Sequence, residues 1–370
     1  MKKLVVKIGS STLTTAQGKA DYAYLESLVK QIAAIRAEGW QPVIVSSAAI
    51  ACGLEALGIT QRPSDMPSLQ AAASVGQNVL SAAYAKAFAS FDILTSLVLL
   101  TRRDTADRNA YLHARDTFLR LLDLGVVPVV NENDTVSVEQ IRFGDNDTLA
   151  ALVACLIDAD LVVILSDVEG LFDKDPTANH DARIIPLVEA IDAALMGSAT
   201  GARTTIGSGG MITKLTAARV LMAAGIETAI CSGRRPQVLI DLIKGEPLGT
   251  RFLAKEKPHE ITPKKLWIAL GDSTRGALTV DDGAKTALVA KGGSLLCVGL
   301  ASVQGSFDRG DIIDIKDLQG HVFARGKVAA SSDELDLACG LSGKALKANR
   351  LLSPLATKPV IHRDDLVVFE

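Results

Sequence analysis

The sequence predicts an α/β fold in which a mainly parallel sheet is sandwiched between helices, followed by a small β-barrel-like domain. Over the first two thirds of the chain, short β-branched runs alternate with helical patterns, which is typical of a parallel sheet covered on both faces. The 370 residues are 48% apolar but only 4% aromatic, so a large core of aliphatic side chains is available. Near residue 250 the pattern changes to short strands separated by glycine turns.

Apolar runs and helical spacing define the elements expected in the first part. Strands are predicted at Leu4–Ile8, Pro42–Val45, Ile93–Leu99, Val126–Val130, Leu161–Leu165 and Thr228–Ile230. Apolar residues at helical spacing predict helices over Tyr22–Glu38, Arg115–Leu124, Leu149–Ile157 and Met211–Ala224. Three of these helices are followed by a glycine in the C-cap position, namely Gly39, Gly125 and Gly225.

Residues 254–263 are predicted to be a linker, because this segment is rich in lysine and proline and has no strong period. The linker separates a domain at 1–253 from a domain at 264–370. In the second domain, strands are expected at Trp267–Leu270, Leu278–Val280, Ser294–Val298, Asp311–Ile315 and His321–Lys327. Helices are expected around Gly283–Ala290 and Ser332–Cys339.

Charge and cysteine usage exclude several classes of protein. The net charge of −3 gives no global argument for nucleic acid. The five cysteines are scattered and form no CxxC pair, so neither a disulfide framework nor a zinc site is predicted. No signal peptide or apolar run of membrane-spanning length is present. We therefore expect a cytoplasmic protein with no membrane partner and no metal held by the protein alone.

Small or polar residues follow four of the predicted strands. Lys7 lies near the end of the first strand and Gly9 follows that strand, while Ser46 and Ser47 follow the second. Asn131–Asp134 and Ser166–Asp167 follow two later strands. Because ligands of open α/β sheets bind beyond the carboxyl ends of the strands, these residues predict one shared site.

Two lysines in this set indicate an anionic ligand. Lys7 lies at the end of a buried strand, where an unpaired ammonium group is costly. Its alternative role is a lysine that reaches solvent at the sheet edge. The segment Gly207–Lys214 opens a helix, and glycine backbone amides at a helix start favour phosphate. This segment is neither GxxxxGK[ST] nor GxGxxG, and its alternative role is a flexible loop with a solvated lysine.

A third polar segment, Gly144–Thr148, also precedes a helix. Asp147 within it could be a simple N-cap. It could equally organise lysines, a metal ion or a substrate ammonium group. A hairpin pairing Val136–Val138 with Ile141–Phe143 is expected just before it. The five histidines are isolated in the sequence, so none is expected to be catalytic.

The ordered set of motifs resembles the glutamate 5-kinases of the amino acid kinase superfamily, and the tail resembles a PUA domain. The kinase motifs are Lys7–Ser11, Ser46–Ile50, Leu100–Arg102, Asn109–Thr117, Asn131–Asp134, Gly144–Asp147, Ser166–Leu171 and Gly209–Lys214. The tail motifs are Gly276–Ala284, Ser294–Leu296, Gly310–Asp311 and His362–Asp365. The resemblance covers essentially the whole chain, with the motifs in the same order.

This resemblance implies transfer of the ATP γ-phosphoryl group to the side-chain carboxylate of L-glutamate, the first step of proline synthesis, with Mg²⁺ on ATP. It implies catalytic roles for Lys7, Lys214 and Asp147, and glutamate binding by Ser47, Asp134 and Asn146. Its implied ATP-binding residues are Lys7, Gly9, Ser166, Asp167, Ser208, Gly209, Gly210, Met211, Ile212, Thr213 and Lys214. It also implies inhibition by proline and assembly into a homo-oligomer.

The chain departs from the family at Ala48, where the resemblance leads us to expect glycine. If the backbone there needs a positive φ, alanine costs about 1 kcal/mol, and its methyl group could crowd the substrate. Acetylglutamate, aspartate and uridylate kinases remain alternatives, because they share the lysines and glycines. An RNA-binding protein is a second alternative, since PUA domains often bind RNA, but the tail lacks a dense basic cluster and stacking aromatics. The missing glycine fingerprint argues against a nicotinamide-dependent enzyme.

Overall fold

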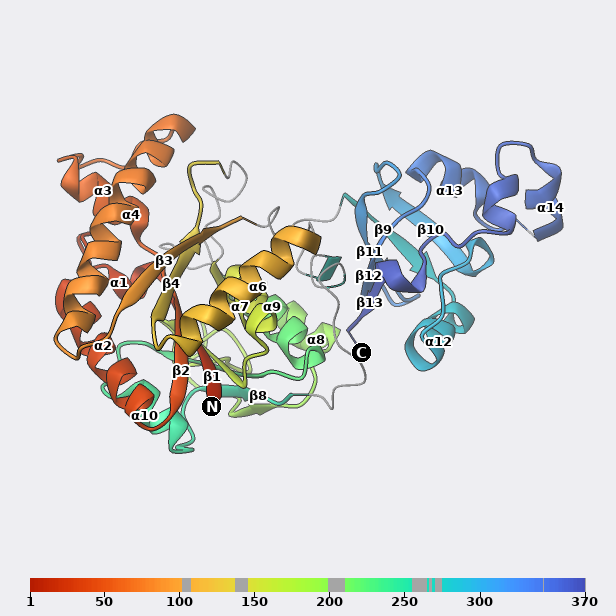
Figure 1. The fold of residues 1–370 in the computed structure, drawn as a ribbon. Helices are drawn as coiled ribbons and strands as arrows, with labels where there is room; N and C mark the ends of the chain where they lie inside the picture. The colour runs from red at the N-terminus through yellow and green to blue at the C-terminus, as the bar shows by residue number, and fades with distance from the viewer. Residues whose placement is uncertain are drawn as a thin grey trace. The chain divides into compact units, whose positions relative to one another are not determined.

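The computed structural model describes residues 1–101, 108–136, 146–198, 210–254, 265, 268–269, 275–341 and 343–369. The chain divides into two compact units, Met1–Glu260 and Ile261–Glu370 (Figure 1). Apart from Ala254, the expected linker at 254–263 lies outside the described residues. None of the described helices is both long enough and apolar enough to span a membrane.

The first unit is built on an eight-stranded sheet in the order β3-β4-β2-β1-β5-β7-β8-β6. The strands are β1 (Lys2–Ile8), β2 (Trp40–Val45), β3 (Thr95–Leu100), β4 (Val127–Glu132), β5 (Leu161–Ser166), β6 (Leu187–Val188), β7 (Glu227–Ser232) and β8 (Thr250–Phe252). Neighbouring strands are parallel except for the antiparallel pair β7 and β8. The predicted α/β class with a mainly parallel sheet is confirmed.

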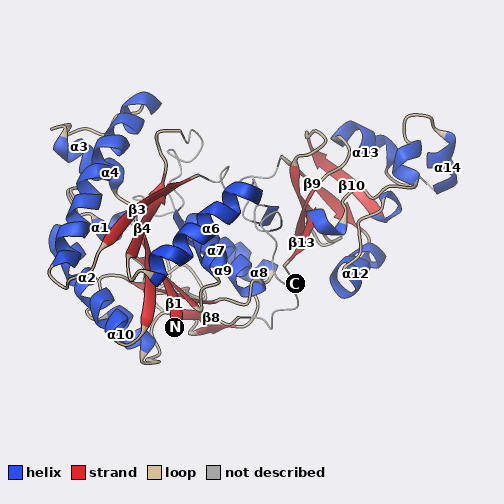
Figure 2. Cartoon of the chain, viewed as in Figure 1, coloured by secondary structure: helices blue, strands red, loops and turns tan. Residues whose placement is uncertain are grey.

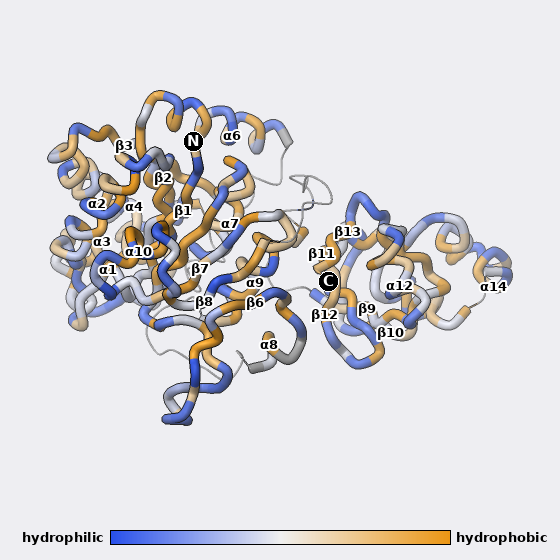
Figure 3. Tube along the Cα trace, turned by 90° about the horizontal axis from the view of Figure 1, so that it is seen from below, coloured by the Kyte–Doolittle hydropathy of each residue, from blue (hydrophilic) through white to orange (hydrophobic). Residues whose placement is uncertain are grey.

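Helices cover both faces of this sheet (Figure 2). On one face lie α1 (Ser10–Leu13), α2 (Tyr22–Ala37), α3 (Ala49–Ala56), α4 (Met66–Ala89) and α10 (Val238–Ile243). On the other lie α6 (Arg108–Asp123), α7 (Asn146–Ile157) and α9 (Met211–Ala223), while α8 (Ala193–Ser198) follows β6. Both β4 and β5 are buried along their whole length, and the central strands carry mostly hydrophobic colour in Figure 3. Such strands need cover on both faces.

Side-chain alternation along β1 decides which face each residue meets. Leu4, Val6 and Ile8 are fully buried in the core shared with α2 and α4. Because successive strand residues point to opposite faces, Lys7 is directed to the face covered by α7 and α9. The same strand therefore contributes both to the core and to a polar cluster.

The helices and strands predicted in the first unit are present, with shifted ends. The helix expected at Arg115–Leu124 is the second half of α6, and the strand expected at Ile93–Leu99 runs from Thr95 to Leu100. Gly39, Gly125 and Gly225 have φ of +91°, +73° and +72°, as left-handed C-caps require. The hairpin expected at 136–143 lies outside the described residues, apart from Val136, which is in a turn.

The second unit has its own five-stranded sheet in the order β10-β9-β11-β12-β13. Its strands are β9 (Gly276–Val280), β10 (Leu300–Gly305), β11 (Ile312–Lys316), β12 (Val322–Lys327) and β13 (Leu366–Val368). Its helices are α12 (Asp282–Lys291), α13 (Ser332–Ala338) and α14 (Gly343–Ala348), with short 3₁₀ turns at Cys297–Gly299, Ser353–Ala356 and Arg363–Asp365. The predicted β-rich second domain is thus confirmed as a separate sheet.

Two strands expected in this unit are wrong. Within the run Trp267–Leu270, the described residues Ile268 and Ala269 are helical and fully buried. Within Ser294–Val298, Leu295 forms only an isolated bridge with Ile361, and the strand follows at β10. Short apolar runs fit a buried helix and a buried strand equally well, so periodicity alone could not separate them.

Two glycines allow α3 and α4 to touch along their backbones. A Cβ atom on Gly76 of α4 would lie 1.7 Å from the Ala49 carbonyl oxygen, and one on Gly53 of α3 would lie 1.7 Å from the Ala72 carbonyl oxygen. Backbone atoms cannot yield as a flexible side chain can. The two helices therefore keep this spacing only with glycine at both positions.

We expect Gly76→Ala to lower the free energy of unfolding by roughly 2–3 kcal/mol, because the new methyl group forces α3 and α4 apart. Urea unfolding followed by circular dichroism measures this. Gly197→Ala in α8 is the matched control, since a Cβ there meets no atom within 4 Å and should raise helix stability by up to about 1 kcal/mol. An unchanged urea midpoint for Gly76→Ala would contradict the analysis.

Candidate active site

The carboxyl ends of β1, β2, β4 and β5 meet at one edge of the first unit's sheet. In the strand register Lys7 lies between Val45 of β2 and Ile164 of β5, and Val45 lies opposite Val130 of β4. Residues that follow these strands are therefore within a few strand spacings of each other. The polar residues predicted to share one site do share this edge.

Three buried charged groups form the centre of this edge. The Lys7 Nζ lies 2.7 Å from Asp147 Oδ1, and the Lys214 Nζ lies 3.2 Å from Asp147 Oδ2. Lys7 and Lys214 are each 5% exposed, and Asp147 is fully buried. One carboxylate thus joins lysines that are more than 200 residues apart in the chain. The three side chains together carry one net positive charge.

The charged state of Asp147 is maintained by the two lysines. Burial alone would raise the pKa of this carboxyl, but the ammonium groups of Lys214 and Lys7 outweigh burial and hold the pKa well below its ordinary value. The Thr213 hydroxyl also donates to Asp147 Oδ2 at 2.9 Å. Asp147 lies in the first turn of α7, where the helix dipole favours a negative charge.

A second cluster lies one residue earlier in α7. The Asn146 Nδ2 lies 2.7 Å from the Ser46 carbonyl oxygen, 2.9 Å from Ser47 Oγ and 3.0 Å from Asn131 Oδ1. This amide therefore ties the end of β2 to the end of β4. Since Asn146 and Asp147 are consecutive, the start of α7 connects the amide cluster to the lysine cluster.

Asp134 lies at the same edge, in the turn that follows β4. Its carboxylate forms no hydrogen bond or ion pair with the part of the chain that the structure describes. Burial raises the pKa of Asp134 to about 6. A half-buried carboxylate without a cation is a suitable place for a cationic ligand group.

On the other side of Lys7, backbone and hydroxyl groups line the edge. The Gly9 amide donates to the Leu165 carbonyl oxygen at 3.1 Å, and a Cβ on Gly9 would lie 3.3 Å from that oxygen and 3.7 Å from Lys7 Nζ. Glycine thus keeps the space beside the lysine open. The Ser166 hydroxyl donates to Asp167 Oδ1 at 3.0 Å.

The helix α9 delivers Lys214 from a glycine start. Gly210 is its N-cap with extended backbone, Met211 is its first residue, and Lys214 follows one turn later. Ile212 is 38% exposed, so its side chain is directed away from the buried cluster. Ser208 and Gly209, with Gly144 and Asp145, lie outside the described residues.

The left-handed backbone expected at Ala48 is present, with φ of +74°. The methyl group is buried in the core and lines a small cavity with Leu13, Cys52 and Leu80. The alanine therefore carries backbone strain while its methyl group packs among apolar side chains.

Sequence reasoning missed the contribution of α4. Three side chains of this helix contact the strand ends. Gln70 donates to the Thr135 carbonyl oxygen, Gln77 donates to the Glu132 carbonyl oxygen, and the Tyr84 hydroxyl bonds to the Ser46 hydroxyl. The available signal was their spacing of seven residues within one helix, which places them along one face.

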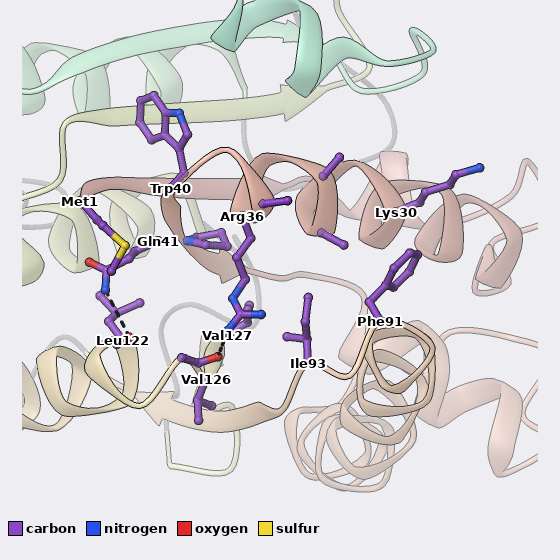
Figure 4. Close-up of a pocket in the computed structure, with 15 residues that line it drawn as sticks. Met1, Lys30, Arg36, Trp40, Gln41, Phe91, Ile93, Leu122, Val126 and Val127 are labelled. Carbon is purple, nitrogen blue, oxygen red and sulfur yellow. Dashed lines mark hydrogen bonds between the residues drawn. The ribbon is translucent and has the colours of Figure 1, made fainter.

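A pocket of about 650 Å³ lies at the other end of the strands (Figure 4). Trp40 and Gln41 at the start of β2 and Val126 and Val127 at the start of β4 line it. Because it opens at the amino ends of these strands, it is separate from the charged cluster at their carboxyl ends.

Comparisons with known proteins agree with this architecture. The amino acid kinase family matches residues 2–232, and the PUA domain matches residues 276–352. The chain is 44% identical to the glutamate 5-kinase of Caldanaerobacter subterraneus subsp. tengcongensis over 100% of this chain and 98% of that protein. It is 46% identical to the glutamate 5-kinase of Bordetella parapertussis over 99% of this chain and 96% of that protein. A solved carbamate kinase from Giardia lamblia bound to AMP-PNP shares the fold, with a TM-score of 0.51 at 18% identity over 69% of this chain and 99% of that chain.

We expect Ala48→Gly to change the free energy of unfolding by less than about 1 kcal/mol, because relief of the left-handed strain offsets the lost methyl burial and the greater freedom of the unfolded chain. The matched control is Ala51→Gly in the interior of the same helix, α3, where glycine gains no strain relief and should cost about 1 kcal/mol or more. Urea midpoints compare the two variants. A larger loss for Ala48→Gly than for Ala51→Gly would contradict the strain at position 48.

Proposed function

The chain belongs to the amino acid kinase family, as one of its glutamate 5-kinases, and we propose that it transfers the γ-phosphoryl group of ATP to the side-chain carboxylate of L-glutamate. The product would be γ-glutamyl phosphate, and the reaction would be the first step of proline biosynthesis. Acetylglutamate, aspartate and uridylate kinase activities are not favoured, because the full-length relatives at 44–46% identity are named glutamate 5-kinases.

The observation that carries this proposal is the buried cluster of Lys7, Asp147 and Lys214. A carboxylate acceptor is already ionised at neutral pH, so the reaction needs no general base. It needs alignment of the reactants and neutralisation of the transferring phosphoryl group. Two buried ammonium groups held 2.7 and 3.2 Å from one shared carboxylate supply an excess positive charge. We assign Lys7 and Lys214 to phosphoryl contact and Asp147 to their orientation.

The amide cluster and Asp134 are assigned to L-glutamate. Ser47 and Asn146 are already hydrogen-bonded to each other and offer polar groups to a carboxylate. Asp134 offers a negative charge without a protein partner among the described residues, which suits the substrate's α-ammonium group. Proline has the same ammonium and α-carboxylate groups, so we propose that it inhibits at an overlapping site.

The nucleotide is assigned to the side of Lys7 that Gly9, Ser166 and Asp167 line. The remaining residues proposed for it are Ser208, Gly209, Gly210, Met211, Ile212, Thr213 and Lys214. Among the described residues, no group of three or more His, Cys, Asp or Glu side chains could hold a metal ion. We propose that Mg²⁺ arrives on the ATP phosphates and that Asp167, which lines the nucleotide side, would hold its hydration water. When bound, Mg²⁺ neutralises phosphate charge.

Assembly and compartment are further parts of the proposal. The edge strand β3 exposes Leu97 to 41%, and Leu94 just before it is 73% exposed. Apolar side chains on an unpaired edge support a homo-oligomer that covers them. None of the five cysteines, all of which the structure describes, forms a disulfide, which supports a reducing cytoplasm. RNA binding by the PUA domain is not part of the proposal.

Coupled ADP release with and without L-glutamate tests the proposed activity. We expect ADP release that depends on L-glutamate. N-acetyl-L-glutamate, L-aspartate and UMP, supplied in its place, should give at most a small fraction of that rate. Preference for any of these three acceptors would contradict the proposal.

We expect Lys214→Ala to lower kcat by at least about a hundredfold while changing the KM for L-glutamate much less, because the lost ammonium group acts on the transferring phosphoryl. Steady-state kinetics at saturating ATP measures both constants. Lys174→Ala is the matched control, because its ammonium group pairs with Asp181 at an exposed position, and it should leave kcat unchanged. Near-normal turnover of Lys214→Ala would remove this lysine from the chemistry.

We expect kcat/KM for L-glutamate to fall about tenfold per pH unit below about pH 6, because protonation of Asp134 removes the charge that holds the substrate ammonium. Burial raises the pKa of Asp134 to about 6, so this charge is lost at a higher pH than for an exposed aspartate. Asp134→Asn should have a low kcat/KM without this acidic limb. A wild-type profile that stays flat through pH 6 would exclude Asp134 from the role.

A further inference from the structure

Helix α4 presents a stripe of three polar side chains to the carboxyl edge of the sheet. Gln70 Nε2 donates to the Thr135 carbonyl oxygen at 3.2 Å, and Gln77 Nε2 donates to the Glu132 carbonyl oxygen at 3.3 Å. The Tyr84 hydroxyl lies 3.0 Å from Ser46 Oγ. Two of these contacts hold backbone on either side of Asp134. The stripe therefore supports the turn that carries the carboxylate assigned to the substrate ammonium.

Gln77 differs from the other two members of the stripe. Its side chain is only 6% exposed, and its Oε1 atom is buried without a hydrogen-bond partner in the part of the chain that the structure describes. The amide orientation is determined by its neighbour, because the Glu132 carbonyl oxygen can only accept and must therefore face Nε2. The free atom is thus an acceptor. A buried acceptor without a donor is costly unless a ligand completes it.

Three contacts of neighbouring residues connect the region around Gln77 to the amide cluster. The preceding residue, Gly76, packs against the Ala49 carbonyl of α3, two residues after Ser47. On the other side, the Glu132 amide donates to Asn131 Oδ1 at 2.9 Å. The same Asn131 Oδ1 accepts from Asn146 Nδ2 at 3.0 Å. Through its bond to the Glu132 carbonyl oxygen, the Gln77 side chain therefore lies next to the end of β4, two residues before Asp134.

We propose that Gln77 Oε1 accepts a hydrogen bond from the α-ammonium group of L-glutamate and so selects an amino acid over a plain dicarboxylate. The inference rests on the proposed function. At neutral pH both carboxylates of L-glutamate are acceptors only, and the ammonium group is its one hydrogen-bond donor. An acceptor-only atom in the glutamate site can therefore contact no other polar group of this substrate.

Gln77 and Asp134 then divide recognition of the ammonium group. Asp134 supplies the charge, and Gln77 supplies a neutral acceptor whose direction is set by its bond to Glu132. A ligand without the ammonium group, such as glutarate, leaves both acceptors without a donor. Sites that hydrogen-bond one substrate group reject analogues that lack it, because their own polar groups stay unpaired.

Two substitutions separate ligand contact from structural support. Gln77→Met keeps the size and removes both the acceptor and the Nε2 donor. Gln77→Glu keeps an acceptor in the Oε1 position, replaces the donor to Glu132 by an oxygen atom and adds a negative charge. Gln70→Met is the matched control on the same face of α4, because it removes the analogous bond to Thr135 but no buried, unpartnered acceptor.

The readouts are kcat and KM for L-glutamate and the inhibition constant of glutarate, all at about pH 8, well above the Asp134 pKa of about 6. We expect Gln77→Met to raise KM for L-glutamate roughly ten- to a hundredfold with a smaller effect on kcat, and to leave glutarate inhibition within about twofold. Gln77→Glu should instead increase the preference for L-glutamate over glutarate, since its added negative charge attracts the substrate ammonium group and repels glutarate. Gln70→Met should leave the ratio of the KM for L-glutamate to the inhibition constant of glutarate unchanged.

If both Gln77 variants weaken the binding of L-glutamate and of glutarate equally, Gln77 only supports Glu132. This result would overturn the inference but not the proposed activity. If Gln77→Met does not fold, Gln77→Glu decides alone, because an unchanged or lowered preference for L-glutamate in that variant overturns the inference. Wild-type protein that releases no ADP in response to L-glutamate would overturn the proposed function itself.

Discussion

The site depends on one buried carboxylate shared by two buried ammonium groups. Asp147 is fully enclosed and remains charged only because Lys7 and Lys214 flank it. Conversely, neither lysine could be buried without that carboxylate, since an unpaired buried ammonium group is strongly unfavourable. The residual positive charge of the trio makes this edge of the sheet suited to a phosphoryl group. Stability and chemistry thus rest on the same ion pairs.

The start of α7 connects this charged centre to the side of the site that we assign to the amino acid. Asn146 binds the ends of β2 and β4, and Asp147, the next residue, binds the two lysines. A displacement of this helix start would move both halves together, so acceptor and donor keep their relative position. Alignment of two reactants is the main requirement of phosphoryl transfer. Two consecutive residues in the first turn of a buried helix, Asn146 and Asp147, provide this alignment.

The opposite face of the sheet contributes through close packing. Because Gly53 and Gly76 let α3 and α4 touch, the polar stripe of α4 reaches the strand ends from which Ser46 and Glu132 project. The strained backbone of Ala48 is part of the same junction, and its methyl group packs in the core. Helix α4 on one face therefore supports the ends of β2 and β4, while α7 and α9 on the other face carry Asp147 and Lys214.

The sequence by itself determined the alternation of strands and helices, the polar endings of four strands and the ordered family motifs, because these are local patterns along the chain. It also indicated an unusual lysine, Lys7, at the end of a buried strand. It did not decide whether Asp147 is a simple N-cap or a partner of the lysines. Only the tertiary structure decided that Asp147 joins Lys7 to Lys214, that the methyl group of Ala48 faces the core, and that Gln77 donates to the Glu132 carbonyl oxygen. These are contacts between residues far apart in the chain, and they depend on how helices pack across a sheet, which local periodicity does not encode. The wrong strands at Trp267–Leu270 and Ser294–Val298 have the same cause, since burial rather than local pattern decided their conformation.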